Sequence, residues 1–467
     1  MSRLLILGVS PLPFYADEYL SGLGIGTWEL AKPLLQDGHH VTLIAYGDSP
    51  GEDQPLSENP EVRRWPNLRL IVREPVTPES LSSEVKEALS LAGDFAPDAV
   101  ITAGTPLCSQ VAVELPAEYP MWADLNGAIM PELQAKGASC ADPNLFTVVY
   151  RLYFRLLRRG DHFSTVSDRQ RRMVIGELGM TGRLNRFTFG HDLVSVIPNG
   201  LDREVDQKPH QAVLRDRVCS EDDFVLLWSG GYNNWVDIET LFCGVETAMA
   251  EDPRIHYVST GGGIKGHHEE GYERFRSLVH ASPHRGRFHL LGWLPYRHLV
   301  DYYAEADLGL NVDLDIYESE FGARNRFLSW IQAGLPILTT ISTEISEDLV
   351  SQGLAYGVPM GRADLLAREI QAVASDPGEA RRKGGQALAY ALENWAFEKA
   401  TLPLRRWAES PEQAPDRRSE GKGRDRLDWF LEGFGLALRE IHGEPSPSTP
   451  RRVRDRILGF LTRKAGP

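Results

Sequence analysis

The sequence predicts an α/β protein in which two doubly wound parallel sheets follow one another along the chain. Short apolar runs, which suit buried parallel strands, alternate with segments of helical periodicity over two separate stretches. Most of these runs end at glycine or another turn-forming residue, as strands do where they lead into a helix. At 467 residues the chain is also too long for one compact core. We therefore expect two halves of similar size, each with a Rossmann-like arrangement.

The first half opens with a βαβ unit. Its predicted elements are a strand, a glycine-rich loop, a helix and a second strand, at 3–9, 21–26, 27–36 and 41–46. Gly38 directly follows the helical segment and predicts where it stops. Later apolar runs predict the remaining strands of this half, at 98–103, 120–125, 162–167 and 194–197.

A second series starts after the polar stretch 202–223. Its first strand ends in Gly230-Gly231 and is followed by a helix, and its second strand ends in three glycines. The predicted strands of this half are 224–229, 255–260, 288–291, 308–312 and 337–339, with a helix at 238–249. We expect a first domain over 1–205 and a second over 206–385, with an apolar, Trp-bearing helix at 386–408 that closes the second half.

The composition changes in the final segment, 409–467. Proline- and charge-rich stretches at 410–424 and 445–450 are typical of flexible linkers. Helical periodicity over 427–441 and a basic stretch with interleaved apolar residues over 451–464 predict two tail helices. Two interpretations of the basic helix stay open: a solvated tail, or an amphipathic helix that touches an anionic membrane surface or a partner.

The composition favours a globular protein and disfavours several classes of function. A net charge of −15 disfavours sequence-independent binding to nucleic acid, which needs a basic face. The four cysteines are widely spaced without a CxxC pair, so they indicate neither a zinc site nor a disulfide framework. The first apolar run is too short for a membrane span or a signal peptide, and no run of about 18 apolar residues follows. We expect a cytoplasmic protein, or one peripheral to the inner face of the membrane through 451–464.

Glycine-rich loops follow several predicted strands, at the edge where open α/β sheets bind ligands. Backbone amides in such loops can approach a phosphate or a sugar hydroxyl, although a tight turn also needs glycine for steric reasons alone. Three successive glycines at 261–263 are hard to explain by packing. Trp235 packs on the following helix or stacks on a ligand. The candidate ligand contacts in these loops are Gly24, Gly26, Gly230, Gly231, Asn233, Trp235, Lys265, Gly292, Trp293 and Leu294.

The richest constellation lies at 317–336, where two arginines stand among carboxylates just before an apolar helix. Guanidinium groups such as Arg324 and Arg326 suit a diphosphate and stabilise a phosphate leaving group, and the carboxylate of Glu318 suits a sugar hydroxyl. The alternative is a salt-bridged helix start, which contributes little when exposed. At the end of the strand 120–125, Asp124 and Asn126 either contact the transferred sugar or the acceptor hydroxyl, or form a cap or turn.

Five segments, in this order, resemble retaining glycosyltransferases of the GT-B fold, broadly of the glycosyltransferase family 4 type. They are the N-terminal glycine-rich loop with WELAKPLLQDGHHVTLI, then VSVIPNGLD, FHLLGWLPYRHLVDYYAEADLGL, AGLPIL and NWAFEKATLPL, and the resemblance covers residues 1–408. It implies two Rossmann-like domains that face a cleft, with the acceptor at the first domain, the nucleotide-sugar donor at the second, and the closing helix packed back on the first.

The resemblance also implies an activity. A hexose-type sugar would move from a nucleotide diphosphate sugar to a glycan, lipid-linked or small-molecule acceptor, with retention of anomeric configuration, in glycan, glycoconjugate or polysaccharide synthesis. No divalent metal and no cofactor besides the donor would be needed. Two alternatives stay open: a non-catalytic member that binds nucleotide sugar or scaffolds an assembly, and another GT-B enzyme such as a nucleotide-sugar epimerase or a phosphorylase.

The chain departs from the family pattern at the donor site. Members usually carry two glutamates eight positions apart before AGLP, whereas here Ser329 stands at the second position and Glu318 reaches the first only with two extra residues. The usual Arg and Lys of the loop after the first strand of the second domain are absent. The segment 324–326 resembles an Arg-x-Arg variant, so its arginines are expected to neutralise the diphosphate. Phe321 and Gly322, just before them, complete the predicted donor residues.

Overall fold

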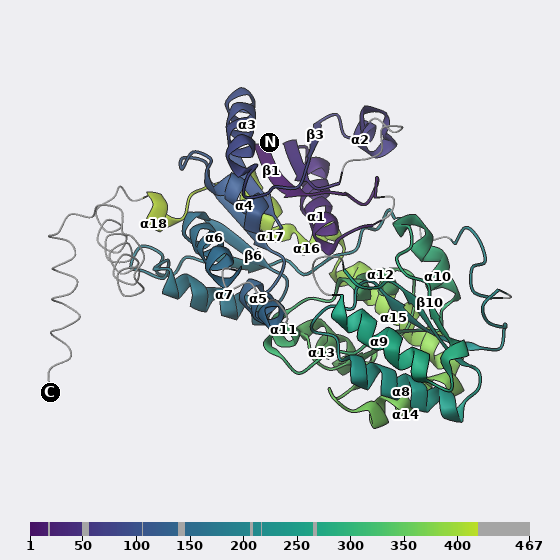
Figure 1. Cartoon of the computed structure of the whole chain (residues 1–467). Coiled ribbons are helices and arrows are strands. Elements are labelled where there is room, and N and C mark those ends of the chain that lie inside the picture. Colours follow the sequence, from purple (N-terminus) through teal and green to yellow (C-terminus); the bar gives the residue numbers. More distant parts are fainter. Residues whose placement is uncertain are drawn as a thin grey trace, which may run out of the picture.

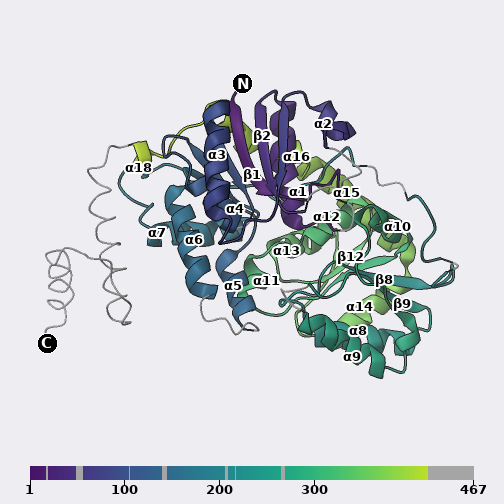
Figure 2. The ribbon, with the colours of Figure 1, turned by 45° about the horizontal axis from the view of Figure 1, so that its top comes forward.

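The chain forms two α/β domains in a computed structural model (Figures 1 and 2). The structure describes residues 1–16, 19–48, 56–104, 106–138, 145–205, 209–215, 217–264 and 269–418. The tail helices predicted at 427–441 and 451–464 lie outside these residues, as does Lys265. No helix of the described part is long and apolar enough to cross a bilayer.

The first domain is built on a seven-stranded parallel sheet with the strand order β3-β2-β1-β4-β5-β6-β7. The chain runs from the central β1 to one edge and then crosses back, so the sheet is doubly wound as predicted. The strands are β1 Arg3–Val9, β2 His40–Tyr46, β3 Leu68–Arg73, β4 Ala99–Ala103, β5 Met121–Leu125, β6 His162–Thr165 and β7 Val194–Val196. β3 is missing from the sequence-based series, because this half-buried edge strand alternates apolar residues with arginine.

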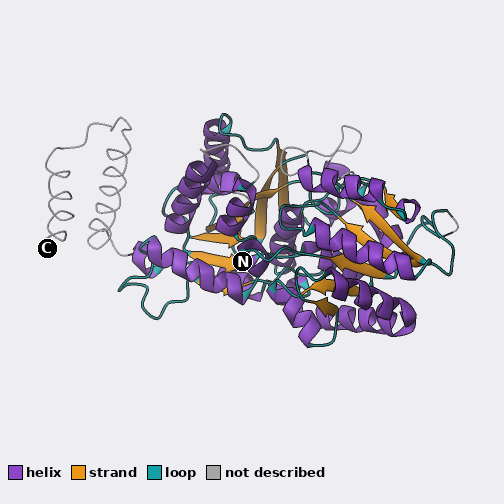
Figure 3. Cartoon of the chain, turned by 60° about the horizontal axis from the view of Figure 1, so that its bottom comes forward, coloured by secondary structure: helices purple, strands orange, loops and turns teal. Residues whose placement is uncertain are grey.

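Helices cover both faces of this sheet (Figure 3). Leu4 and Ile6 of β1 point to the layer that contains α1, whereas Leu5 and Leu7 point to the layer of α3, α4, α6 and α7, as the two-residue period of a strand requires. The helices of the domain are α1 Gly22–Gln36, α2 Pro60–Arg64, α3 Leu81–Phe95, α4 Pro106–Val113, α5 Ile129–Gly137, α6 Leu145–Arg159 and α7 Asp168–Met180.

The second domain contains a six-stranded parallel sheet with the order β10-β9-β8-β11-β12-β13. Its strands are β8 Phe224–Ser229, β9 Ile255–Thr260, β10 Phe288–Leu290, β11 Leu308–Asn311, β12 Ile337–Thr340 and β13 Tyr356–Val358. β13 was not predicted, because its three residues are too few to give a pattern. The helices are α8 Ile238–Glu251, α9 Glu270–Ala281, α10 Leu299–Glu305, α11 Tyr317–Phe321, α12 Asn325–Gln332, α13 Glu344–Ser351, α14 Ala363–Ser375 and α15 Pro377–Asn394.

The segment predicted as one closing helix over 386–408 is divided between the domains. Residues up to Asn394 belong to α15, which packs on the second domain through Ala387 and Ala391. After Trp395 the chain crosses back, and α16 Phe397–Ala400 and α17 Leu402–Glu409 cover the first sheet. The domain boundary at 205 and 206 stays a prediction, since residues 206–208 are not described.

Part of the predicted linker 410–424 is packed on the first domain instead of being free. The buried side chain of Arg417 lies 2.7 Å from Asp161, and the amide of Ala414 donates to the same carboxylate at 2.9 Å. Asp416, in the short helix α18 Pro415–Arg418, pairs with Arg183 at 2.7 Å. These charged groups find partners in the folded domain that a composition-based reading of the sequence does not reveal.

Helix α1 begins at Gly22, five residues earlier than predicted. Ser21 caps it, because its Oγ accepts a hydrogen bond from the amide of Gly24 at 3.0 Å. A Cβ on Gly24 would overlap the carbonyl oxygen of Pro11, and one on Gly26 would lie 2.5 Å from Nδ2 of Asn126. The predicted glycine loop is therefore a helix start whose glycines permit close packing.

Replacing Gly24 with alanine should lower the free energy of unfolding by about 1–3 kcal/mol, because the added methyl group forces the helix start away from Pro11. Gly176 is the matched control: it is also helical, but a Cβ there meets no atom of the described structure within 4 Å. Gly176→Ala should stabilise by up to about 1 kcal/mol. Urea denaturation measures both, and equal effects at the two positions would contradict the packing argument.

Candidate active site

A cleft of about 230 Å³ lies between the two domains, at the carboxyl ends of strands of the second sheet. From the first domain it is lined by the segment just before α1 and by the first turn of that helix. The second domain contributes the ends of β8 and β9, the loop after β10, and α12. The lining residues are Tyr19, Leu20, Gly22, Ile25, Ser229, Gly230, Gly231, Asn233, Trp235, Thr260, Ile264, Trp293, Leu294, Tyr296, Leu299, Tyr303, Ala323, Arg324, Asn325, Arg326 and Ser329.

The cleft brings together nine of the residues predicted from the sequence. They are Gly230, Gly231, Asn233, Trp235, Trp293, Leu294, Arg324, Arg326 and Ser329. Gly230 adopts a φ of +89°, which side-chain-bearing residues rarely do, so this glycine is required by the turn that ends β8. The predicted donor residues Gly24, Gly292, Phe321 and Gly322 do not line this cleft, although Gly322 lines a neighbouring cavity beside the domain connection.

The three glycines at 261–263 have a packing reason that the sequence did not suggest. A Cβ on Gly261 would overlap the carbonyl oxygen of Gly230, because the loops after β8 and β9 pass against each other. The carbonyl of Gly263 accepts a hydrogen bond from Nε1 of Trp293 at 2.9 Å. Gly261 therefore lets the loops after β8 and β9 pack closely where they border the cleft.

Aromatic side chains form one end of the cleft. Tyr19 of the first domain meets Trp293 of the second edge-to-face, with 5.4 Å between ring centroids. Both rings are partly exposed, at 43% and 42%. Exposed, anchored aromatic surface of this kind suits a planar apolar group such as a nucleobase.

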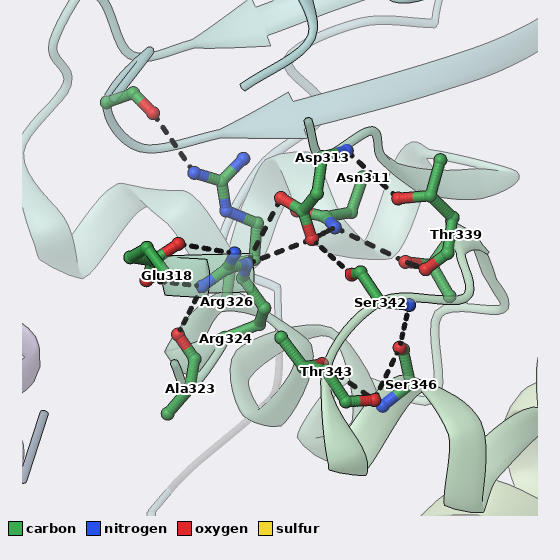
Figure 4. Close-up of polar contacts among 12 residues, drawn as sticks. Asn311, Asp313, Glu318, Ala323, Arg324, Arg326, Thr339, Ser342, Thr343 and Ser346 are labelled. Atoms are coloured by element: carbon green, nitrogen blue, oxygen red, sulfur yellow. Dashed lines mark hydrogen bonds and ion pairs between the residues drawn. The ribbon is translucent and has the colours of Figure 1, made fainter. Parts of the chain in front are cut away.

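Arg324 is the centre of a buried ion-pair network (Figure 4). Its Nε lies 3.0 Å from Asp313 Oδ2, and its two terminal nitrogens bind the oxygens of Glu318 at 3.0 and 2.9 Å. Asp313 also accepts from Asn311 at 2.9 Å and Ser342 at 2.8 Å. All three charged side chains of the network are at most 2% exposed.

The network leaves little of Arg324 for a ligand. Burial by itself lowers the pKa of Arg324, but Asp313 and Glu318 more than reverse that effect, so the pKa is raised. Burial raises the pKa of Glu318 despite its bond to Arg324. Arg324 matches the salt-bridge alternative, with the difference that the pairs are buried rather than exposed. It is therefore a poor candidate for a diphosphate ligand, and Glu318 a constrained one for a sugar hydroxyl.

Arg326 is partly buried and has no carboxylate partner among the described residues. Its Nη2 donates to the carbonyl of Gly231 at 3.0 Å, and the guanidinium lies 4.1 Å from the ring centroid of Trp228. Its Nη1 has no hydrogen-bond partner among the described residues. Burial lowers the pKa of Arg326 to about 10, so the group stays charged at neutral pH. Arg326 thus places a cation with a buried, unpartnered nitrogen at the cleft wall, next to the loop after β8.

Three further residues complete this region, and the sequence analysis missed them. The side chains of Tyr303, Ser229 and Ser329 line the cleft, which gives a hydroxyl-bearing wall where the resemblance places a carboxylate. Asp313 stands just past a predicted strand end, and that position was the only available signal. Asn325 hydrogen-bonds Asn199 of the domain connection and packs against Gly22 of the first domain, a contact between residues about 300 positions apart.

The residues predicted on the acceptor side lie outside the cleft lining. Asp124 is buried in the first domain, where its Oδ1 accepts a hydrogen bond from Ser164 at 2.6 Å, and burial raises its pKa to about 7. Asn126 and Gly26 do lie together, where β5 meets α1. Glu132 of α5, which was not predicted, has its pKa raised to about 7, mainly by burial and then by Glu318 of the other domain.

Comparison with known proteins agrees with this architecture. Residues 21–190 match the family model described as a glycosyl transferase 4-like domain. No curated protein matches the sequence. Similar solved structures include a sucrose-phosphate synthase from Thermosynechococcus elongatus, which is 17% identical with a TM-score of 0.66 and covers 88% of this chain and 98% of its own.

Two further structures cover 88% of this chain and 100% of their own. HepE from Anabaena, in complex with UDP and glucose, is 15% identical with a TM-score of 0.62. The trehalose-6-phosphate structure from E. coli, bound with UDP-2-fluoro glucose, is 13% identical with a TM-score of 0.61. These likenesses show that the chain has the GT-B fold. Together with the domain match, they support the prediction of a glycosyltransferase.

Replacing Arg324 with methionine should destabilise the protein by about 3–5 kcal/mol, because it leaves Asp313 and Glu318 buried without a cation. Without the arginine both carboxyl groups bind protons more tightly in the folded chain than in the unfolded one. The folded state is then favoured at low pH, so the deficit should shrink as the pH falls. Urea denaturation of both proteins at several pH values measures this, and a deficit that is small or grows on acidification would contradict it.

Asp124 makes a separate pH prediction. Since its pKa is about 7 in the folded protein and lower when unfolded, its contribution to stability is complete at low pH and is lost as the pH rises through 7. Asp124→Asn retains an acceptor for Ser164 but cannot ionise. The melting temperature of the variant relative to wild type should therefore rise as the pH increases from about 5 to about 8. A difference independent of pH would contradict the raised pKa.

Proposed function

We propose that the protein transfers a hexose-type sugar from a nucleotide diphosphate sugar to a hydroxyl acceptor. The observation that carries this proposal is the interdomain cleft, whose wall contains the cation Arg326 beside the Gly230-Gly231 turn. In the part of the chain that the structure describes, no acidic side chain lines this cleft. A site with an unpaired cation, backbone amides and an aromatic end suits a nucleoside diphosphate.

In this proposal, each part of the nucleotide-sugar donor contacts a different part of the cleft. The base lies at the aromatic end with Trp293, and the ribose lies along the hydroxyls of Tyr303 and Ser329. The diphosphate meets Arg326 and the turn after β8. Because Arg326 is partly buried, its charge stabilises the departing diphosphate more than a fully exposed arginine would. Uridine is the first base to test, since HepE and the E. coli structure were solved with UDP or a UDP sugar.

Retention and metal independence belong to the proposal as well. A structural study of trehalose-6-phosphate synthase, which matches the chain with a TM-score of 0.60 at 12% identity, names glycosyl transfer with retention. Here the charge of the leaving group is met by Arg326, so the described residues supply a positive group where a metal would otherwise act. Closure of the two domains, which already touch through Tyr19 and Trp293, would align acceptor and donor.

A non-catalytic nucleotide-sugar-binding protein is the second candidate. It is favoured by one observation: both oxygens of Glu318, the carboxylate expected at the transferred sugar, are held by Arg324. Such a protein would bind UDP in the cleft but would not turn over a UDP sugar.

The test compares Arg326→Met with wild type. Loss of the guanidinium and its charge should weaken UDP binding about 10- to 100-fold, as expected for a charge-assisted hydrogen bond. The fold should persist, because methionine fills the space on Trp228. Calorimetry with UDP measures the affinity. Arg362→Met is the matched control, since Arg362 of the same domain is exposed and pairs only with Asp364 nearby.

Unchanged UDP affinity in Arg326→Met would contradict the placement of the diphosphate. UDP binding without hydrolysis or transfer from any UDP sugar would favour the second candidate. The same reactions run in EDTA, with the anomeric configuration of the product followed by NMR, test metal independence and retention.

A further inference from the structure

Among the described residues, a second cavity, of about 560 Å³, shares no lining residue with the donor cleft. It is formed where α5 and α7 of the first domain meet the second domain, and α5 and α11 lie side by side there (Figure 2). The lining residues are Gln134, Arg169, Asp315, Ile316, Tyr317, Glu320, Ser342 and Met360.

The two walls of this cavity are fixed relative to each other. Glu344 of the second domain accepts hydrogen bonds from the amides of Asp168 and Arg169 at 2.9 and 2.7 Å, at the N-terminus of α7. Arg169 in turn donates to the carbonyl of Ser342 at 2.9 Å and pairs with Glu347. Carboxylates are stabilised at a helix N-terminus, so these contacts hold the cavity in shape before any ligand arrives.

The side chains around the cavity mouth are suited to a sugar. The ring of Tyr317 is 62% exposed, a high value for an aromatic residue. Gln134, Asp315 and Glu320 surround it, and among the described residues the structure gives no hydrogen bond or ion pair to their side chains. A pyranose combines an apolar C–H face, which stacks on an aromatic ring, with a rim of hydroxyls that amide and carboxylate groups bind.

The charge of the cavity narrows the class of sugar. Asp315 and Glu320 are unpaired carboxylates, whereas the guanidinium of Arg169 is already bound by Glu347 and Ser342. The net charge that faces a ligand is therefore negative, which repels uronic acids, sialic acids and phosphates. Neutral and amino sugars remain.

The position of the cavity links it to the donor cleft. Glu318 of α11 is buried against Arg324, which lines the donor cleft, whereas its neighbours Tyr317 and Glu320 line the cavity. The helix that lines the cavity is therefore joined to the wall of the donor cleft by a buried ion pair. We propose that this cavity binds a non-reacting neutral or amino sugar of the acceptor, so that the acceptor is an oligosaccharide or a larger glycan. The proposal rests on the proposed transferase function.

The test measures binding of wild type, with saturating UDP, to an array of neutral, amino and acidic oligosaccharides. The wild type should bind one or more neutral or amino glycans, and Tyr317→Ala should weaken binding to the best of them at least tenfold. Phe189→Ala is the control, because Phe189 is a 93% exposed aromatic residue of the first domain that does not line the cavity. Tyr317 is itself exposed, so its removal should leave the fold and the UDP affinity unchanged.

Three outcomes would overturn the cavity proposal: no glycan bound by wild type, equal binding by Tyr317→Ala, or binding restricted to acidic glycans. Failure of the proposed function shows itself separately, as absence of UDP binding in the wild type. Glycan binding that depends on Tyr317 without UDP binding would retain the carbohydrate site and remove the transferase.

Discussion

The buried ion pairs of Arg324 with Asp313 and Glu318 set the geometry on which the candidate site depends. Asp313 follows β11, Glu318 lies in α11, and Arg324 is the N-cap of α12, so one guanidinium joins three elements at the carboxyl edge of the second sheet. Buried charges cannot be left single without a large cost, and this makes the three positions interdependent. The joint holds α12 in the orientation that directs Arg326 toward the loop after β8.

This ion-pair network gives different roles to two arginines that look equivalent in the sequence. Arg324 is fully engaged in the buried ion pairs, whereas Arg326, two residues later, lines the cleft and has one nitrogen without a hydrogen-bond partner among the described residues. α11 is likewise shared: its buried Glu318 completes the joint and its exposed Tyr317 lines the second cavity. The buried ion-pair network, the proposed donor site and the proposed acceptor site therefore share one segment of about ten residues.

Much of the fold follows from the sequence because buried parallel strands leave continuous apolar runs, as at 224–229 and 255–260. β3 and β13 were not predicted, because an arginine-bearing edge strand and a three-residue strand leave no such run. For the site, a glycine turn at a strand end predicted Gly230 and Gly231. The separate roles of Arg324 and Arg326 could not be predicted from the sequence, because Asp313 becomes a partner of Arg324 only through tertiary packing. The reason for glycine at position 261 is also tertiary, because a Cβ there would overlap the carbonyl oxygen of Gly230.

The return of α16 and α17 to the first sheet has a consequence for how the protein is made. Phe397, Leu404 and Ala408 are buried against Leu4 and Trp28, near the start of the chain. During synthesis the N-terminal sheet is complete at Val196, and α16 and α17 add their part of its cover only after about 200 further residues. The first domain is thus the first to be translated and the last to be completed. A chain that ends after the second domain would lack α16 and α17 and would expose the face of the first sheet that these helices cover.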